Sequence, residues 1–365
     1  MRYYRVALLP GDGIGQDVIA EGVQTLDLLA SLFGDFRLDM QPFDWGCEYY
    51  LRHGRMMPTD GLKTLAEFDA IYLGAIGFPT VPDHISLRGL LIPIRQHFDL
   101  YVNLRPIRLL PGIQGPLRGR GPADIDFLCV RENTEGEYAG VGGRSHAGTD
   151  DEVALQTSVF TRRATRRIIR YAFELARREN RRKVTSATKS NAMQYGMVLW
   201  DEVFTEVARD YPDIETEKWH IDALSARFVT HPQTFDVVVG SNLFGDILTD
   251  LGGALQGSIG IPPSANIHPE PETRRGPALF EPVHGSAPDI AGRGIANPIG
   301  ALWSAQMMLD YLGEPSAAAS LMRAIEAVTA QGQVLTPDLG GRASTREMSE
   351  AVREQLRKDD LLVSS

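Results

Sequence analysis

Cysteine, long apolar runs and positive charge are all in short supply in this chain of 365 residues. Its two cysteines, Cys47 and Cys129, match no metal-binding spacing and suggest no disulfide framework. No apolar run reaches the roughly 20 residues that cross a bilayer, and the apolar stretch in the N-terminal MRYYRVALLPGDG is too short for a signal peptide. The net charge of −10 argues against non-specific nucleic-acid binding. We therefore expect a cytoplasmic protein with no membrane and no nucleic-acid partner.

One segment, TRRATRRIIRYAFELARRENRRK at residues 161–183, departs from this acidic average. Its apolar residues recur at helical spacing, which predicts a helix with one buried face. The arginines between them fit a solvated outer face, and a nucleic-acid contact is the weaker alternative.

The chain is long enough for two domains, and strand-like runs alternate with helical patterns along it. This alternation is typical of α/β proteins. Two stretches rich in Gly and Pro, residues 112–122 and 261–277, predict long loops. The part from residue 297 onward is expected to be largely helical. Strands are expected at residues 5–10, 37–43, 70–77, 124–130, 182–189, 219–223 and 235–240, and a helix at residues 17–33.

The stretch LPGDGIGQD, residues 9–17, carries part of a Rossmann dinucleotide fingerprint. The last glycine of that fingerprint is replaced by Gln16. Gly11, Gly13 and Gly15 instead predict a sharp turn from a strand into a helix whose N-terminus is exposed. A cofactor can approach such a turn, but many turns of this kind only connect two elements.

Two carboxylates lie four residues apart in SNLFGDILTDLGGALQGSIG, directly after the expected strand at 235–240. At this spacing Asp246 and Asp250 share one face of a helix, where like charges weaken the helix slightly. The arrangement raises the question of what the two carboxylates hold.

Further polar candidates lie near expected strand and loop edges. Arg95, Arg105 and Arg131 together would suit a substrate with two carboxylates, although a surface ion pair is the ordinary role of any one of them. Tyr138 lies in a Gly-flanked segment, where a buried tyrosine with a satisfied hydroxyl is the plain alternative. Lys189 follows an expected strand. It would ordinarily be exposed and inert, but a nearby metal and guanidinium groups would lower its pKa and let it accept a proton.

The segment EPVHGSAPDIAGRGIANP, residues 281–298, gathers His284, Asp289 and Asn297 among glycines and prolines. A histidine in such a loop is ordinarily structural. An acidic residue that accepts a hydrogen bond from a ribose 2′-hydroxyl selects NAD over NADP, and Asp289 followed by Ile290 is a candidate for this role.

Together these motifs resemble the β-decarboxylating dehydrogenases, the family of the isocitrate, isopropylmalate and tartrate/D-malate dehydrogenases. The resemblance runs from PGDGIG to TPDLGGRAST, and its strongest pieces are NLRP, VRENTEGEYAG, NLFGDILTD and EPVHGSAPDIAG. It implies an α/β fold of the isocitrate/isopropylmalate dehydrogenase type, not a Rossmann fold, in which two α/β domains share a large twisted mixed sheet. The larger domain would combine residues 1–99 and 256–365 and carry the NAD-binding loop. The central domain, residues 100–255, would carry metal and substrate residues and the dimer interface.

The resemblance also implies roles for the candidate residues. Asp246 and Asp250, with Asp222 from the second subunit of a homodimer, would bind Mg²⁺ or Mn²⁺, both of which suit oxygen-only ligation. The acidic pair would therefore bind a divalent cation. Lys189, also donated across the dimer, would be the general base, and Tyr138 would be the acid that reprotonates carbon. The active site would lie in the cleft between the domains.

Substrate and cofactor residues follow from the same resemblance. A clamp of Arg95, Arg105 and Arg131 would hold the substrate carboxylates. A need for a monovalent cation such as K⁺ stays open. NAD would be bound by Ile14, His284, Gly285, Ser286, Ala287, Pro288, Asp289, Ile290 and Asn297.

Substrate choice in the family is set just before Arg95, in DHISLRGLLIPIR. Arg88 stands where the isopropylmalate enzymes have an acidic residue, which disfavours an alkyl substituent, and Leu91 and Pro93 match the isocitrate enzymes poorly. The flanking sequences are most similar to the tartrate and D-malate dehydrogenases, which typically have Trp where Arg88 stands. We therefore expect NAD-dependent oxidation and decarboxylation of a small 2-hydroxy dicarboxylic acid, tartrate or D-malate. An arginine at this position could bind a further carboxylate, as in the homoisocitrate enzymes. Isopropylmalate and homoisocitrate are the alternative substrates.

Two other classes of protein fit less well. A non-catalytic regulatory subunit of the family would be expected to lose the base, the tyrosine or the metal ligands, all of which this chain keeps. A metal-dependent hydrolase or a non-redox decarboxylase would use the aspartates and arginines but leave HGSAPDI unexplained.

Overall fold

The chain divides into two compact units in the computed structural model, which describes residues 1–363. The first unit holds Met1–Leu100, Pro106–Ile125 and Gly253–Ser365, and the second holds Tyr101–Arg105 and Asp126–Gly252. Residues 106–125, which we expected in the central domain, are grouped with the first unit. A Cβ on Gly112 would lie 2.1 Å from the carbonyl oxygen of Thr329, so this loop packs directly on helix α11 (Pro315–Gln331).

Ten strands are hydrogen-bonded in the order β2-β1-β3-β12-β11-β4-β5-β10-β8-β9, and β6 and β7 form a separate two-stranded sheet. β1 is parallel to β2 and β3, and β10 is parallel to β5 and β8, whereas β11 and β12 are antiparallel. β4 (Val102–Arg108) contributes residues to both units. The predicted α/β class with a large mixed sheet is confirmed.

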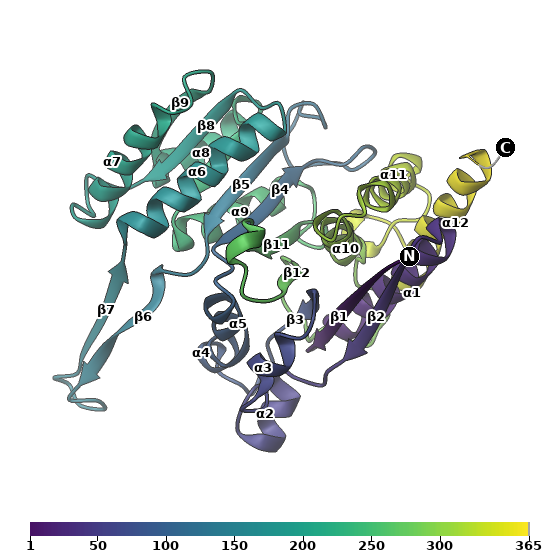
Figure 1. Ribbon diagram of the computed structural model, residues 1–365, viewed down its shortest axis with the longest axis horizontal. Coiled ribbons are helices and arrows are strands. Elements are labelled where there is room, and N and C mark those ends of the chain that lie inside the picture. Colours follow the sequence, from purple (N-terminus) through teal and green to yellow (C-terminus); the bar gives the residue numbers. More distant parts are fainter. Residues whose placement is uncertain (364–365) are drawn as a thin grey trace. The chain divides into compact units, whose positions relative to one another are not determined.

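The first unit covers its strands with helices (Figure 1). Helix α1 packs on β3, α10 packs on β11 and β12, and α11 and α12 pack on these helices. The buried phenol of Tyr72 in β3 donates to the carbonyl of Ala301 in α10 at 2.8 Å, and Gly22 lets α1 approach the same ring. The elements are β1 (Arg2–Gly11), α1 (Ile14–Phe33), β2 (Phe36–Pro42), β3 (Ala70–Ala75), β11 (Pro263–Ile267), β12 (Ala278–Pro282), α10 (Ile299–Tyr311) and α12 (Thr345–Val363).

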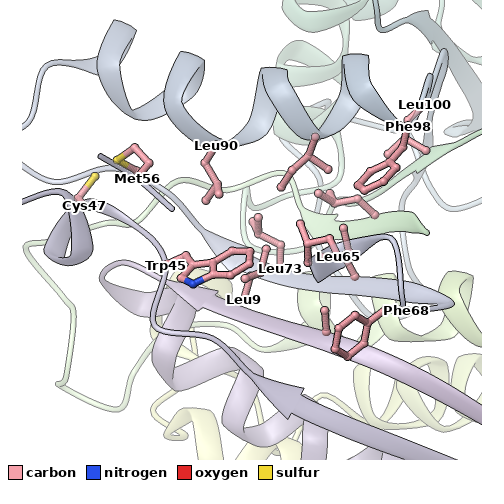
Figure 2. Close-up of a cluster of buried hydrophobic side chains, with 14 of the residues drawn as sticks. Leu9, Trp45, Cys47, Met56, Leu65, Phe68, Leu73, Leu90, Phe98 and Leu100 are labelled. Carbon is pink, nitrogen blue, oxygen red and sulfur yellow. The ribbon is translucent and has the colours of Figure 1, made fainter. Parts of the chain in front are cut away.

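A further apolar core in this unit joins β1 and β3 to a set of short helices (Figure 2). Burial raises the pKa of the Cys47 thiol within it to about 12. The short helices are α2 (Cys47–His53), α3 (Gly61–Leu65), α4 (Asp83–Ser86), the π-helical turn η1 (Leu87–Leu91) and α5 (Ile92–His97). The labelled side chains of this core are Leu9, Trp45, Cys47, Met56, Leu65, Phe68, Leu73, Leu90, Phe98 and Leu100.

In the second unit the predicted basic helix is confirmed as α6 (Arg162–Arg178). Arg162 and Arg166 pair with Glu206, and Arg177 pairs with Asp213, so these arginines are engaged by carboxylates on the protein surface. The other elements are β5 (Asp126–Glu132), β8 (Lys183–Thr188), α7 (Gly196–Ala208), β9 (Glu215–His220), α8 (Ile221–Thr230), β10 (Val237–Gly240) and α9 (Asn242–Leu255).

Two local predictions were wrong. The strand expected at residues 219–223 ends at His220, whose extended backbone forms the N-cap of α8, so Asp222 lies in the first turn of a helix. The long loop expected at 261–277 contains strand β11, in which Ala265 and Ile267 are buried. The Pro-rich flanks hid this strand, although proline is tolerated at the first residue of a strand.

A hairpin of β6 (Gly136–Ser145) and β7 (Val153–Val159) extends away from α6 and α7 (Figure 1). Its side chains are largely exposed, and these include Val141, Val153 and Leu155. No helix in the described part of the chain has the length and apolarity to cross a membrane.

Candidate active site

The start of α9 holds Arg131 of β5 in place. The Nε of Arg131 donates to the carbonyl of Asn242 at 2.8 Å, and its Nη2 donates to Asn242 Oδ1 at 2.8 Å. A Cβ on Gly245 would lie 2.6 Å from the Arg131 side chain, so glycine at this point of the helix permits the close approach. Arg131 is only 2% exposed, which leaves it few orientations.

Asp246 is the centre of a cluster on the next turn of α9. Its Oδ1 accepts from Arg131 Nη1 at 2.6 Å and lies 3.6 Å from Arg105 Nη1. Its Oδ2 accepts from the hydroxyl of Tyr138 at 2.9 Å. Arg105 is anchored by Thr249 Oγ1 at 2.6 Å. The structure thus brings Arg105, Arg131, Tyr138 and Asp246 together, four residues that the family resemblance assigns to one site.

Asp250 lies one helical turn further on and is exposed. Desolvation by the surrounding protein and the neighbouring charge of Asp246 both raise the pKa of Asp250, while Arg105 and Arg131 oppose that rise. The Asp250 side chain makes no hydrogen bond or ion pair in the part of the chain that the structure describes. A pair of carboxylates with this oxygen-only donor set fits a hard divalent cation, whose charge would relieve the repulsion.

Lys189 and Asp222 form a separate pair. The Nζ of Lys189 lies 2.8 Å from Asp222 Oδ1, and this contact lowers the pKa of Asp222. Among the side chains that the structure describes, no three His, Cys, Asp or Glu residues are grouped to hold a metal. In one chain, therefore, Asp222 does not join the pair on α9.

The predicted substrate arginine Arg95 lies in the first unit and is 6% exposed. Its Nη2 donates to Glu281 Oε1 at 2.8 Å, and Asn266 donates to the same oxygen at 2.9 Å. The Nε atoms of Arg95 and Arg105 are both buried without an acceptor among the described residues. A buried donor without an acceptor costs free energy. Both guanidinium groups are therefore suited to bind an anionic ligand.

Arg88 differs from these buried arginines. It is exposed on the π-helical turn η1, and it makes no hydrogen bond or ion pair with another described residue. Such turns are frequent at functional sites.

The predicted cofactor residues lie in the first unit, at the turn after β1 and in the loop after β12. The backbone N–H of Ile14 donates to the carbonyl of Ser286 at 2.8 Å, and a Cβ on Gly13 would lie 2.0 Å from that oxygen. Glycine at position 13 therefore allows the turn after β1 to touch the loop after β12. The remaining loop residues are partly or fully exposed at Gly285, Ala287, Pro288, Asp289 and Ile290.

Two features of this loop indicate a ligand. His284 is buried, which lowers its pKa, and its Nε2 has no hydrogen-bond partner within the described residues. Ala287 adopts a positive φ of 38°, a strained backbone conformation for a residue with a side chain. These features fit a loop that binds a dinucleotide. The loop has a buried ring nitrogen without a partner, a strained backbone and an exposed carboxylate at Asp289.

Several residues that complete the site were not predicted. Glu137 accepts from Ser241 Oγ at 3.2 Å and from the backbone N–H of Leu243 at 3.1 Å, so it caps α9. Glu281 neutralises and orients Arg95, and Asn266 donates to the same carboxylate oxygen and so helps to hold Glu281. Glu137 and Glu281 lie within two of the motifs that carry the family resemblance, VRENTEGEYAG and EPVHGSAPDIAG. Their hydrogen-bond partners are distant in sequence, so the spacing of residues could not predict these contacts.

Comparison with known proteins gives consistent matches along the whole chain. Residues 5–352 match the family model described as isocitrate/isopropylmalate dehydrogenase. A probable tartrate dehydrogenase/decarboxylase, TtuC, of Agrobacterium vitis is 53% identical, with coverage of 99% of this chain and 98% of the relative. The D-malate dehydrogenase [decarboxylating] of Escherichia coli (strain K12) is 54% identical, with coverage of 96% and 98%. The crystal structure of isocitrate dehydrogenase from Methylococcus capsulatus superposes with a TM-score of 0.86 at 36% identity, covering 97% and 99%.

The acidic pair should cost stability when no metal is bound. We expect Asp250→Asn to raise the stability of the metal-free protein by about 0.2 to 0.5 kcal/mol, because it removes one of two like charges on a helix face. The same variant should lose the rise in Tm that Mn²⁺ gives the wild-type protein. Thermal unfolding with and without MnCl₂ measures both effects. Asp213→Asn, which removes a carboxylate paired with Arg177, is the control for the response to Mn²⁺. A wild-type response to Mn²⁺ in Asp250→Asn would remove this residue from the metal site.

Proposed function

The chain belongs to the isocitrate/isopropylmalate dehydrogenase family, and we propose that it oxidises and decarboxylates a small 2-hydroxy dicarboxylic acid. The proposed oxidant is NAD⁺, the proposed metal is Mg²⁺ or Mn²⁺, and the proposed substrate is tartrate or D-malate. The observation that supports this most directly is the cluster around Asp246, where two buried guanidinium groups and a phenol converge on one carboxylate of the acidic pair. The names of the relatives at 53% and 54% identity support the choice of substrate. A cytoplasmic location completes the proposal.

The substrate carboxylates are bound by the arginines, each of which is held in place by a neighbour. Asn242 positions Arg131, Thr249 positions Arg105, and Glu281 positions Arg95. Side chains whose rotamers are already restricted lose little freedom when the substrate binds. A divalent cation held by Asp246 and Asp250, with Asp222 of a second subunit, would lower the pKa of the substrate hydroxyl.

Proton transfer is assigned to Lys189 and Tyr138. Lys189 accepts the hydroxyl proton as the C2 hydride passes to NAD⁺, which gives a 2-oxo acid. Loss of CO₂ from the β-carboxylate leaves an enol, and Tyr138 protonates its carbon. In the structure Tyr138 donates its proton toward Asp246, so the hydroxyl already points at the acidic pair.

A homodimer is part of this proposal. Lys189 and Asp222 bind each other within one chain and do not join Asp246 and Asp250, so we assign them to the site of a second copy. The hairpin of β6 and β7 supports an interface, because a two-stranded sheet is marginal by itself and this one exposes Val141, Val153 and Leu155.

The exposed side chain of Arg88 is an argument for a second class of substrate, one that carries a further carboxylate. Its exposed guanidinium makes no protein contact in the described part of the chain, so it is available to a further carboxylate. Homoisocitrate, which carries a further carboxylate, is therefore the alternative that Arg88 favours, whereas the alkyl group of isopropylmalate would gain nothing from the positive charge.

An absorbance assay at the NADH band tests the proposed function. The panel contains D-malate, tartrate, isopropylmalate and homoisocitrate, each with and without Mn²⁺ and K⁺, and CO₂ release is measured in parallel. We expect Mn²⁺-dependent reduction of NAD⁺ with D-malate or tartrate. Preference for homoisocitrate would support the alternative role of Arg88. No reduction with any of the four acids would favour a non-redox or regulatory protein.

Lys189→Met tests the general base. We expect kcat to fall by about 10² to 10⁴, because positioned proton transfer contributes on this scale. The rise in Tm with Mn²⁺ should persist, since Lys189 is not a metal ligand. Lys183→Met, at the opposite end of β8 and paired with Glu217, is the control and should keep wild-type turnover. A Lys189→Met enzyme of normal kcat would rule out the assignment.

Mixing two inactive variants tests whether the site is shared between subunits. Lys189→Met and Asp246→Asn should each be inactive alone. If Lys189 acts in the partner's site, each mixed dimer has one intact site, so random exchange restores about a quarter of wild-type activity. Unfolding and refolding the mixture ensures exchange, and wild-type protein treated alike sets the scale. Absence of any recovery would show that Lys189 acts in its own chain or that no dimer forms.

A further inference from the structure

The motif LTPDLGGRAST has no role in the site described so far, yet its aspartate joins three segments of the first unit. Asp338 lies in the short 3₁₀ helix η4 (Pro337–Leu339). Its Oδ2 accepts from the Asn297 amide at 2.8 Å and from the Ser258 hydroxyl at 2.5 Å. Its Oδ1 accepts from the hydroxyl of Thr336 at 2.5 Å.

These bonds fix the side chain of Asn297 from outside the cofactor loop. The Asn297 Nδ2 donates to Asp338, and its Oδ1 accepts from the backbone N–H of Ile299 at 2.9 Å, where α10 begins. Asn297 is 5% exposed, and a Cβ on Gly260 would lie 2.7 Å from its Cβ. The side chain therefore has one orientation, and Asp338 supplies the acceptor that sets it.

Thr345, at the end of the same motif, binds the last residues of the cofactor loop before Asn297. The backbone N–H of Thr345 donates to the carbonyl of Gly294 at 2.9 Å, and its hydroxyl donates to the carbonyl of Ala296 at 2.6 Å. The charge of Asp338 also acts on His284, where it favours the protonated imidazole and opposes the effect of burial on its pKa. Residues 336–345 thus form the support of the loop that runs from His284 to Asn297.

We propose that Asp338 is a positioning residue for the nicotinamide dinucleotide, which acts through Asn297. This inference rests on the proposed role of the loop in binding NAD. Asp338 increases cofactor affinity because a loop held in its binding conformation loses less entropy when the ligand binds. The carboxylate itself stays engaged by Ser258 and Thr336 and makes no contact with the cofactor.

The hydrogen-bond geometry predicts which substitutions are tolerated. In Asp338→Asn the amide oxygen can accept from Asn297 and Ser258, and the amide nitrogen can donate to the hydroxyl of Thr336, which is able to accept. Asp338→Ala removes the acceptor and leaves the amide of Asn297 without its partner. The required property of this residue is therefore an acceptor at the Oδ2 position and not the negative charge.

Isothermal titration of the metal-free protein with NAD⁺ measures the effect without catalysis. We expect Asp338→Ala to raise the Kd for NAD⁺ about tenfold, which corresponds to about 1.4 kcal/mol. Asp338→Asn should bind close to wild type. In the turnover assay the KM for NAD⁺ should rise for Asp338→Ala, while kcat and the KM for the hydroxy acid stay unchanged. Asp338→Ser, whose hydroxyl stops short of Asn297, serves in place of alanine if that variant unfolds.

A double-mutant cycle with Asn297→Ala separates positioning from a general loss of structure. If Asp338 acts through Asn297, then Asp338→Ala has little further effect in the Asn297→Ala background. Glu347→Ala is the control, because Glu347 bonds Ser344 at the start of α12 and makes no contact with the loop. It should lower Tm without changing the Kd.

Equal losses for Asp338→Ala in both backgrounds, or an unchanged Kd, would overturn the inference. A wild-type protein that binds no NAD⁺ at all would overturn the proposed function as well, so the two failures are distinguishable.

Discussion

Arg131 is almost fully buried, and its charge is balanced by Asp246 at 2.6 Å. Removing one partner of such a pair leaves a charge in a poorly solvated place and typically costs several kcal/mol. The rest of the site depends on this contact. It fixes the guanidinium against α9, directs Asp246 toward Tyr138, and leaves Asp250 on the next turn with a like charge beside it.

The acidic pair therefore places two like charges side by side on α9. Two carboxylates on one face weaken a helix, and desolvation together with the charge of Asp246 raises the pKa of Asp250. Natural proteins keep such conflicts mainly at functional sites. Two positively charged groups also have an unmet need for a partner. The Nε atoms of Arg95 and Arg105 are buried and lack hydrogen-bond acceptors among the described residues.

In the first unit, two candidate ligand-binding side chains are each oriented by a second residue that is distant in sequence. Glu281 holds Arg95 across 186 residues, and Asp338 holds Asn297 across 41 residues. In each case the supporting carboxylate also accepts from another donor, Asn266 or Ser258, so its own position is restricted. This arrangement keeps the ligand-binding group rigid, which limits the entropy lost on binding.

Periodicity by itself determined the α/β class and the basic helix within residues 161–183, because burial along one element repeats at short intervals in the chain. Sequence motifs identified the candidate site residues. The partners of those residues depended on packing between distant segments. Glu281 beside Arg95, Lys189 beside Asp222 and the membership of residues 106–125 in the first unit have no local signature. Strand β11 was also missed, because its prolines resemble a loop until the neighbouring strands supply its hydrogen bonds. Tertiary structure alone decided these features, since they arise from contacts that no short stretch of sequence contains.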